Sequence, residues 1–553
     1  MSENGSKKNS FIVQAGILAA AGIISRIIGL LYRGPLHRVI GDLGLGYYQT
    51  AHNYYTIVLL ISSYSIPSAI SKVIAQKLGM REYRNAHRIF KCALWYVMAV
   101  GGGASLLLFF GAEIFLSPQE AAVLRAFAPI IFVYGILGVL RGYFQAHKSM
   151  IQTSVSQILE QIANAIVSIG AAYLLIQGTM GTMEMPELEA DQISRATYGA
   201  VGSALGAGAG VLVALLFMIG VYGLNRKVIF RRIRADRHMN EDSYKLIMRN
   251  IVMVVTPFIL STAVYNLSGT VNNTIYTQVL PNLKELDKVT VSSRWGAFSG
   301  QAQTISNIPV AFATALAAAV IPSIAQLAAY GDEKGVRQKI ALAVKSIMLI
   351  SIPCAVGLLV LARPVTGLLF RNVQETEDLV TGLLMSLSLS VIFYAFSTLN
   401  SSILQGLGKV NRPIVNAAIA LAVQTAAAVL LLLYTDLDLY SIAIANTLYS
   451  GVMCILNQWA VRRAAGYRQE IMKTFVVPAL AAACMGAVAW ASYEGLLMLT
   501  ESSRISVVAA IGLAVCVYFA MLLLFRGISE EELRSFPKGH LMVRLAKKLR
   551  LMK

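Results

Sequence analysis

The stretch GIISRIIGLLYRGPL, from Gly22 to Leu36, places an arginine inside an apolar segment of the kind that crosses a membrane. A charged side chain at the centre of a bilayer costs about 2.5–3.5 kcal/mol on insertion scales. Arg26 therefore needs a protein partner, a water-filled cavity or a ligand. The surroundings that the rest of the chain provides for this helix therefore bear on both the fold and the function.

The composition indicates a membrane protein. Of the 553 residues, 56% are hydrophobic and only 14% are charged, and the mean hydropathy is +0.64. Soluble domains carry about 25% charged residues, so this chain lies well outside the range of soluble proteins. We expect no cleavable signal peptide, because the first apolar block is long enough to span and no small-residue cleavage site follows it.

Apolar blocks of spanning length, ~20 residues, recur from one end of the chain to the other. We identify fourteen, at residues 11–34, 50–71, 90–112, 123–145, 155–177, 199–222, 247–278, 297–328, 341–363, 380–404, 412–434, 440–461, 474–494 and 505–526. The sequence thus predicts an all-α polytopic membrane protein with about 14 transmembrane helices. The seventh and eighth blocks are unusually long and contain prolines, which predicts bent helices lining an opening.

The basic residues predict how the chain is threaded through the bilayer. Most of the 47 Lys and Arg residues lie at the two ends of the chain and in the even-numbered loops, whereas the acidic residues lean the other way. By the positive-inside rule, both termini and residues 223–246 are cytoplasmic, and residues 178–198 are outside. The net charge of +19 then reflects topology, and nucleic acid is not indicated. The basic cluster at 225–238 also suits anionic lipid headgroups.

Faint self-similarity divides the chain into two halves and a tail. AISKVIAQ, from Ala69, and AVIPSIAQ, from Ala319, share an Ala-x4-Ile-Ala-Gln pattern. We predict a six-helix lobe at 1–235, a second six-helix lobe at 236–465, and two extra helices with a basic cytoplasmic tail at 466–553. Repeats with an even number of spans are parallel, an arrangement that places a central cavity between the two bundles.

The loops restrict the chemistry. They contain no phosphate-binding G-x-x-x-x-G-K-[ST] motif and no H-E-x-x-H motif, and the five cysteines and six histidines show no metal-ligand spacing. An integral-membrane glycosyltransferase or polymerase would be expected to carry acidic or metal-binding loops. We therefore expect a transporter rather than an enzyme, without a cofactor, which draws on an ion gradient, the membrane potential or downstream consumption of its cargo.

Polar residues within the spans are the candidate site residues, because each is costly there unless it faces a cavity or a partner. In the first half these residues are Arg26, Gln49, His52, Asn53, Gln157, Glu160, Gln161 and Asn164; in the second half they are Asn266, Asn272, Asn273, Gln301, Gln303 and Asn307. Arg26 has two interpretations, as a ligand-binding residue or as the partner of Glu160 in an ion pair that closes the bundle. For the amides, the alternative role is to hold helices together.

Three segments carry a family resemblance. They are SRIIGLLYRGPLHRVIGDLGLGYYQTAHNYY (Ser25–Tyr55), LRGYFQAHKSMIQTSVSQILEQI (Leu140–Ile162) and NIPVAFATALAAAVIPSIAQ (Asn307–Gln326). The chain resembles the stage V sporulation protein B branch of the multidrug/oligosaccharidyl-lipid/polysaccharide exporter superfamily, which is similar to the MurJ-type lipid II flippases. The resemblance implies a V-shaped pair of six-helix lobes in a bacterial plasma membrane. It also implies a cargo: an undecaprenyl-pyrophosphate-linked sugar moved from the cytoplasmic to the outer leaflet.

The resemblance also suggests a site. Arg26 matches the first-span arginine that the MurJ-type flippases use in their cavity, and a guanidinium suits a pyrophosphate because it can donate two parallel hydrogen bonds. The predicted substrate-binding residues are Arg26, Arg33, Asn53, Glu160, Gln301 and Asn307. The chain departs from the Gram-negative pattern in the early part of the second span, which has no acid, and at Gln303 and Thr304, where that pattern has an arginine. Arg141 is an alternative source of positive charge.

Four functions are compatible with these observations. The leading one is translocation of the lipid-linked peptidoglycan precursor, lipid II, by alternating access, with a role in cell-wall synthesis and cell shape. The alternatives within transport are export of another polyprenyl-linked glycan and drug antiport, for which Glu160 is the candidate cation-binding carboxylate. In a different class, the chain is a membrane scaffold or polymerase partner without cargo. Expected partners are the lipid-linked glycan, the bilayer and, as further candidates, cell-wall synthesis enzymes.

Overall fold

The computed structural model is built from helices, and it describes residues 20–64, 66–147, 149–181, 189–236, 241–370, 373–528 and 544. No strand occurs among these residues. Ten of the described helices are long and apolar enough to cross a membrane. The chain divides into two compact units, Met1–Gly300 and Gln301–Lys553. The predicted boundary between 235 and 236 rests on sequence repeats, and that division stays a prediction.

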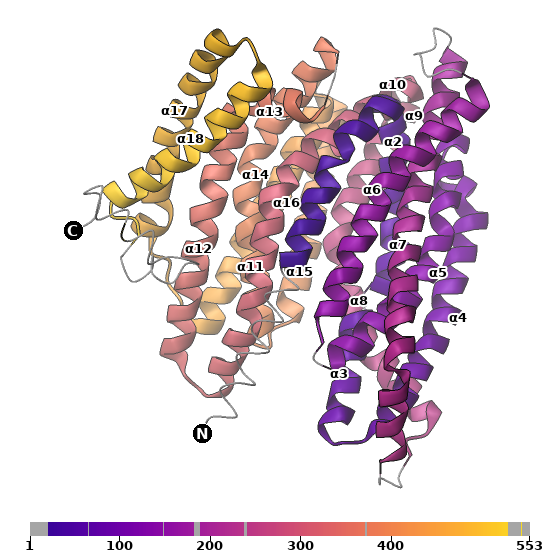
Figure 1. Ribbon diagram of the computed structural model, residues 1–553. Coiled ribbons are helices and arrows are strands. Elements are labelled where there is room, and N and C mark those ends of the chain that lie inside the picture. Colours follow the sequence, from indigo (N-terminus) through magenta and orange to yellow (C-terminus); the bar gives the residue numbers. More distant parts are fainter. Residues whose placement is uncertain are drawn as a thin grey trace. The chain divides into compact units, whose positions relative to one another are not determined.

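The first unit begins with an apolar helix at Ala20–Leu31. It continues with α2 (Arg33–Leu59), the π-helical turn η1 (Leu60–Tyr64), α3 (Ile66–Gly79), α4 (Tyr83–Phe115), α5 (Pro118–Ala146), α6 (Ile151–Met180), α7 (Glu189–Arg234), α8 (Tyr244–Thr274), the π-helical turn η2 (Ile275–Val279), α9 (Leu280–Lys284), α10 (Lys288–Trp295) and the π-helical turn η3 (Gly296–Ala302), whose last two residues belong to the second unit. Figure 1 shows these elements in indigo to pink.

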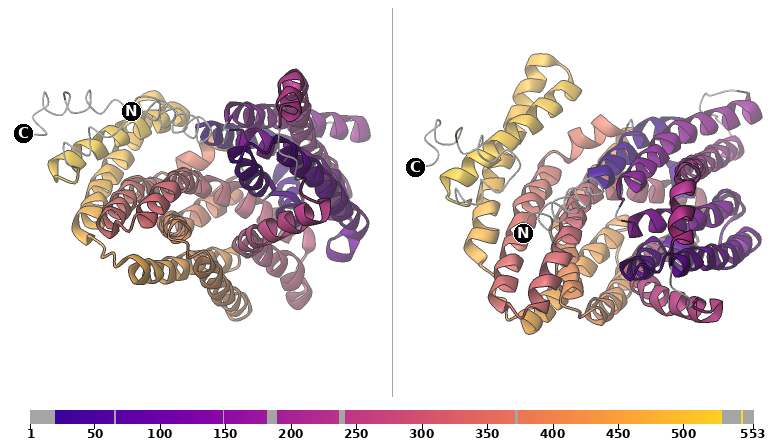
Figure 2. Two further views of the ribbon diagram at one scale, coloured as in Figure 1. Left: turned by 90° about the horizontal axis from the view of Figure 1, so that it is seen from below. Right: turned by 60° about the horizontal axis from the view of Figure 1, so that its bottom comes forward.

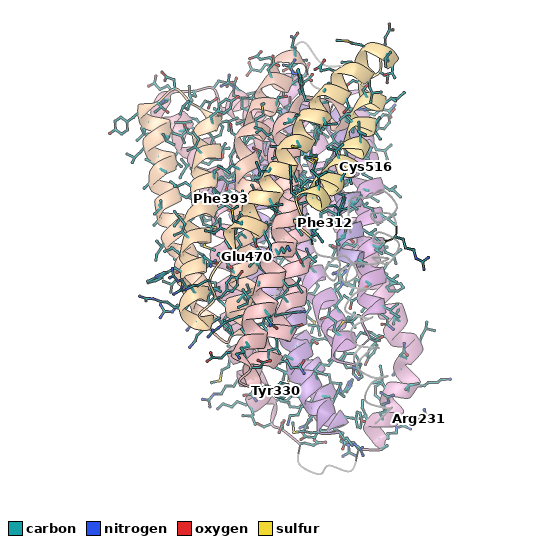
Figure 3. The ribbon with its side chains drawn as sticks, turned by 90° about the vertical axis from the view of Figure 1, so that its left-hand side faces the viewer. Arg231, Phe312, Tyr330, Phe393, Glu470 and Cys516 are labelled. Atoms are coloured by element: carbon teal, nitrogen blue, oxygen red, sulfur yellow. The ribbon has the colours of Figure 1, made fainter. Side chains whose placement is uncertain are left out.

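The second unit contains α11 (Gln303–Ala329), α12 (Glu333–Val360), α13 (Ala362–Leu369), α14 (Gln374–Gly406), α15 (Asn411–Tyr434), α16 (Leu439–Ala465), the π-helical turn η4 (Met472–Val476), α17 (Val477–Thr500) and α18 (Ser503–Leu524). The last two helices form a hairpin that packs on α12 and α13 (Figure 2). The Tyr518 hydroxyl donates to the carbonyl of Leu349 at 2.8 Å and joins this hairpin to α12. Cys516, labelled in Figure 3, is exposed on α18.

The helices match most of the predicted spans. The ten candidate spans coincide with the predicted blocks three to six and nine to fourteen. The blocks at 11–34, 50–71, 247–278 and 297–328 are not among the ten. Residues 11–19 lie outside the described part, and each of the other three blocks contains all or part of a π-helical turn. The count of fourteen therefore stays a prediction. A π-helical turn disrupts the regular helical hydrogen bonds and often occurs at functional positions.

Small residues set the closest helix packing of the first unit. Gly202, Gly206 and Gly210 recur every four residues on α7, and a Cβ at any of them would overlap the backbone of α6. Two helices can approach this closely only where side chains are missing, which is how small residues stabilise helix pairs in membranes. Helices α6 and α7 therefore run side by side along most of their length (Figure 1).

Local signals explain where several helices begin and end. Helix α5 starts with a capping box in which Ser117 and Glu120 satisfy each other's backbone groups, and Pro118 occupies the first turn. Asp287 caps α10 by accepting hydrogen bonds from the backbone of Val289 and Thr290. Gly181, with φ 71°, ends α6 in the left-handed conformation that favours glycine.

Candidate functional site

Arg26 lies on the first described helix, Ala20–Leu31, and its side chain is exposed. No ion pair or hydrogen bond between described residues holds its guanidinium. Three residues further along the same helix, a Cβ at Gly29 would lie 3.5 Å from Oε1 of Gln161 on α6. Residues three apart share a helix face, so the face that carries Arg26 is the one that approaches α6.

The facing side of α6 is polar. Gln157, Glu160, Gln161 and Asn164 are spaced three or four residues apart, so they lie on one broad face of the helix, and all four side chains are partly exposed. Oε1 of Gln157 has no hydrogen-bond partner. Within the described residues, the helix that carries Arg26 thus approaches the polar face of α6, and a shared site of Arg26 and these side chains stays a prediction.

Glu160 pairs with Arg141 of α5. The Arg141 guanidinium donates from Nη2 to Glu160 Oε2 at 2.8 Å and from Nε to Ser156 Oγ at 2.9 Å, and the side chain of Arg141 is only 6% exposed. The alternative interpretation of Arg26, as the ion-pair partner of Glu160, is therefore wrong. Arg141 is also ruled out as a free cation in this arrangement, because Glu160 neutralises it.

Arg33 and the polar residues of α2 contact a different part of the first unit. Helix α2 is bent at Gly41, where φ is 69°. Arg33 Nη1 donates to the carbonyl of Gly300 at 3.4 Å, and Gln49 Nε2 donates to the carbonyl of Ser299 at 3.1 Å. Both carbonyls belong to η3. Arg33 is therefore held by backbone, unlike Arg26.

Two further hydrogen bonds continue this contact along α2. Thr50 Oγ1 donates to Asn273 Oδ1 at 3.1 Å, and the hydroxyls of Tyr54 and Thr274 lie 2.9 Å apart. We call these four contacts, made by Arg33, Gln49, Thr50 and Tyr54 with α8 and η3, the α2 seam. Asn53, predicted as a binding residue, is partly exposed on the same helix.

Glycines let the two sides of the α2 seam touch. A Cβ at Gly46 would overlap the carbonyl of Ser292, and a Cβ at Gly296 would overlap the carbonyl of Asp42. Beside the seam, Glu120 is 2% exposed and accepts a hydrogen bond from Gln278 Nε2 of η2 at 3.1 Å. Sequence reasoning missed Glu120 and Gln278, although the Ser117-x-x-Glu120 capping box was a visible signal for the position of the carboxylate.

The remaining predicted residues belong to the second unit. Gln301 is fully buried in η3, and Asn307 is exposed on α11. Whether these two residues share a cavity with Arg26 stays a prediction. The central cavity that the sequence predicts between the two six-helix lobes also stays a prediction.

The second unit contains a polar network that the sequence analysis did not identify. Asn457 of α16 donates to Ser401 Oγ at 2.9 Å and accepts from Asn416 at 2.8 Å, and Asn400 donates to Gln458 Oε1 at 3.2 Å. These bonds tie α14, α15 and α16 together through neutral groups. Among the described residues, no cluster of three or more His, Cys, Asp or Glu side chains could hold a metal ion.

A known protein family matches most of the chain. The family described as Lipid II flippase MurJ matches residues 115–511. The chain is 25% identical over 494 residues to the Lipid II flippase MurJ of Bacillus subtilis (strain 168), covering 85% of this chain and 86% of that protein. It is 24% identical over 548 residues to Stage V sporulation protein B of the same organism, covering 97% and 100%.

Solved structures share the fold. A lipid II flippase MurJ in an inward closed conformation superposes with a TM-score of 0.65 at 14% identity, covering 92% of this chain and 98% of that one. A multidrug resistance MATE family transporter of the MOP superfamily, in an inward-facing conformation, gives a TM-score of 0.61 at 15% identity, covering 82% and 98%. These helices thus form the MurJ/MATE-like fold of a transporter, not an enzyme, and the chain belongs to the lipid II flippase MurJ family.

Proposed function

We propose that this protein is a flippase that moves undecaprenyl-pyrophosphate-linked peptidoglycan precursor, lipid II, from the inner to the outer leaflet by alternating access. The observation that carries the proposal is the exposure of Arg26 and the chemistry of the side chains near its helix. It is an exposed cation on an apolar helix, its face approaches the amides of α6, and the nearby carboxylate of Glu160 is already neutralised by Arg141.

This arrangement of a guanidinium beside amide side chains suits a pyrophosphate ligand. An uncompensated guanidinium attracts an anion and can donate two parallel hydrogen bonds to its oxygens. The neighbouring amides of Gln157 and Gln161 offer both donors and acceptors to the hydroxyl and amide groups of a sugar-peptide headgroup. Membership of the lipid II flippase MurJ family supports the same cargo class.

The α2 seam supports alternating access. Its contacts include hydrogen bonds and close glycine approaches, which can break and re-form as the helices move. From the charge distribution, we propose that residues 35–49, in the first part of α2, and the α9–α10 segment lie outside the cell. On this topology, with both termini in the cytoplasm, the seam closes the outer end of the pathway and opens to release cargo.

The alternative functions fit these observations less well. A drug antiporter needs a carboxylate that can bind a cation, and Glu160 already has Arg141 as its partner. A scaffold without cargo would have no use for an exposed arginine in a membrane-spanning helix. Another polyprenyl-pyrophosphate-linked glycan shares the anchor of lipid II, so it is the second candidate: Arg26 would serve either cargo equally.

Depletion in cells tests the proposal. If the protein flips lipid II, depletion raises the amount of lipid II in the cytoplasmic leaflet, and wild-type protein restores the normal level whereas Arg26→Ala does not. Arg38→Ala is the matched control, because Arg38 is an exposed arginine of α2 outside the proposed site. Unchanged lipid II together with accumulation of a different lipid-linked glycan would identify the second candidate. Unchanged levels of every lipid-linked precursor would remove the transport proposal.

A further inference from the structure

Helix α7 continues as a single helix well past the apolar part of its sequence. It spans 46 residues, about twice what a membrane crossing needs. Tyr222, at the end of the predicted span, packs against the rings of Phe90 and Tyr143, and the helix runs on to Arg234. Figure 3 labels Arg231 in this extension.

The two sides of the extension differ. One side lines a cavity of about 30 Å³ and packs against α3, α4 and α5. The lining residues are Val228, Ile229, Arg232 and Ile233 of α7 with Leu78, Tyr83, Ala86, Tyr143 and His147. Lys227, Arg231 and Arg234 follow one another at spacings of four and three residues and are all exposed. We call Lys227, Arg231 and Arg234 the basic face of α7.

No acid of the described residues compensates the basic face. The acids that come next in the chain are used elsewhere: Asp236 accepts from the backbone of Arg84, Glu241 pairs with Arg88 at 2.7 Å, and Asp242 pairs with Lys77 at 2.6 Å. The acidic residues that follow α7 therefore contact residues of α3 and α4, not the basic face. The three cations of the basic face have no ion-pair partner within the described part of the chain.

Two features favour a lipid surface over a soluble partner. Leu224, at the start of the extension, is 85% exposed, and an apolar side chain beside cations is typical of a helix at the membrane interface. Lys227 lies five residues beyond Tyr222, or about 7.5 Å along the helix, which is the depth of the headgroups. Arg231 and Arg234 lie within about one to two Debye lengths of the same surface.

We propose that the basic face of α7 binds the phosphate groups of anionic lipids in the cytoplasmic leaflet. This inference does not depend on which cargo the protein flips. A lysine or arginine near an anionic surface contributes roughly a fivefold preference, so three of them suffice to enrich such lipids locally.

The test measures which lipid lies next to Leu224. The full chain, with its native cysteines replaced and Leu224→Cys carrying a bimane fluorophore, is placed in phosphatidylcholine nanodiscs with a minor fraction of phosphatidylglycerol. Quenching is compared between brominated phosphatidylglycerol and brominated phosphatidylcholine at equal mole fraction. We expect at least about a threefold preference for the anionic lipid. The triple variant Lys227→Gln, Arg231→Gln and Arg234→Gln abolishes it.

A charge-matched triple variant provides the control. Lys334→Gln, Arg462→Gln and Arg468→Gln removes three exposed cations from the second unit and should leave the preference intact. Equal quenching by both lipids in the wild-type chain overturns the proposal. The same holds if both triple variants lose the preference for the anionic lipid to the same extent. If inorganic phosphate reduces the quenching by brominated phosphatidylglycerol more than chloride does at equal ionic strength, the basic face is a free-phosphate site instead. Binding of poly-glutamate without any lipid preference would identify a surface for an acidic protein.

Discussion

Arg141 and Glu160 form a buried ion pair that joins α5 to α6, with 2.8 Å between Nη2 and Oε2. A third group, Ser156 Oγ, accepts from the same guanidinium at 2.9 Å. The pair keeps the carboxylate neutralised beside the polar face of α6. It also leaves Arg26 as the exposed cation of that region.

The first prediction concerns the stability of this pair. Removing one partner of a buried pair strands the other charge, which costs about 3–5 kcal/mol. Glu160→Gln should therefore lower the thermal unfolding temperature of the purified protein strongly, because it strands Arg141, the more buried partner. Arg141→Met should lower it less, because it strands the more exposed Glu160. The double variant should recover most of the loss. A double variant as unstable as Arg141→Met would show that the pair is not the main contribution of Arg141.

The second prediction concerns Arg26. Since Arg26 has no ion pair to lose within the described residues, Arg26→Ala should insert and fold at the wild-type level yet fail to flip lipid II. Arg26→Lys should keep part of the activity, because lysine carries the charge but lacks the paired donors. The measurements are the folded yield in the membrane and the cytoplasmic-leaflet level of lipid II. A proportional fall in yield and flipping would make Arg26 a structural residue.

The third prediction concerns the α2 seam. Gly46→Ala and Gly296→Ala each add a methyl group where backbone carbonyls already lie, and overpacking of this kind costs about 1–3 kcal/mol. Both substitutions should favour the open seam. A cysteine pair at Thr50 and Asn273 would then cross-link less efficiently than in the wild-type background.

Gly103 serves as the control for the third prediction, because a Cβ there meets nothing within 4 Å. Gly103→Ala should leave the cross-link unchanged. If Gly46→Ala cross-links as well as Gly103→Ala, the approach of α2 to η3 is not what holds the seam closed.

The fourth prediction concerns topology. In a background without the exposed Cys516, a cysteine at Asp191 should react with an impermeant maleimide in intact cells, and a cysteine at Arg231 should react only after the membrane is opened. Both positions are exposed on α7, one at each end. The reverse pattern would overturn the assignment of both termini to the cytoplasm.

The membrane helices could be predicted well from the sequence because spanning length and apolar composition are local properties. The block at 380–404, for example, forms part of the continuous helix α14. The π-helical turns were not predictable in this way. Whether a turn of helix widens depends on the side chains packed against it, which no short window of sequence contains.

The candidate site could be predicted only in part. Arg26 and the α6 amides could be proposed as site residues because a polar side chain stands out in an apolar block. Arg141 was not recognised as the partner of Glu160, because it lies near the end of its predicted span and its burial depends on how α5 meets α6. The α2 seam joins residues more than 200 positions apart, so no local pattern reveals it.

The glycine contacts between α6 and α7 have a practical consequence for measuring motion. Because the two backbones touch at Gly202, Gly206 and Gly210, one helix cannot slide or rotate against the other without a steric clash. A spin label on the solvent side of α7 therefore reports the displacement of the α6 amides without touching them. Distance spectroscopy on this protein can then follow the polar face of α6 during turnover while the proposed site residues keep their native side chains.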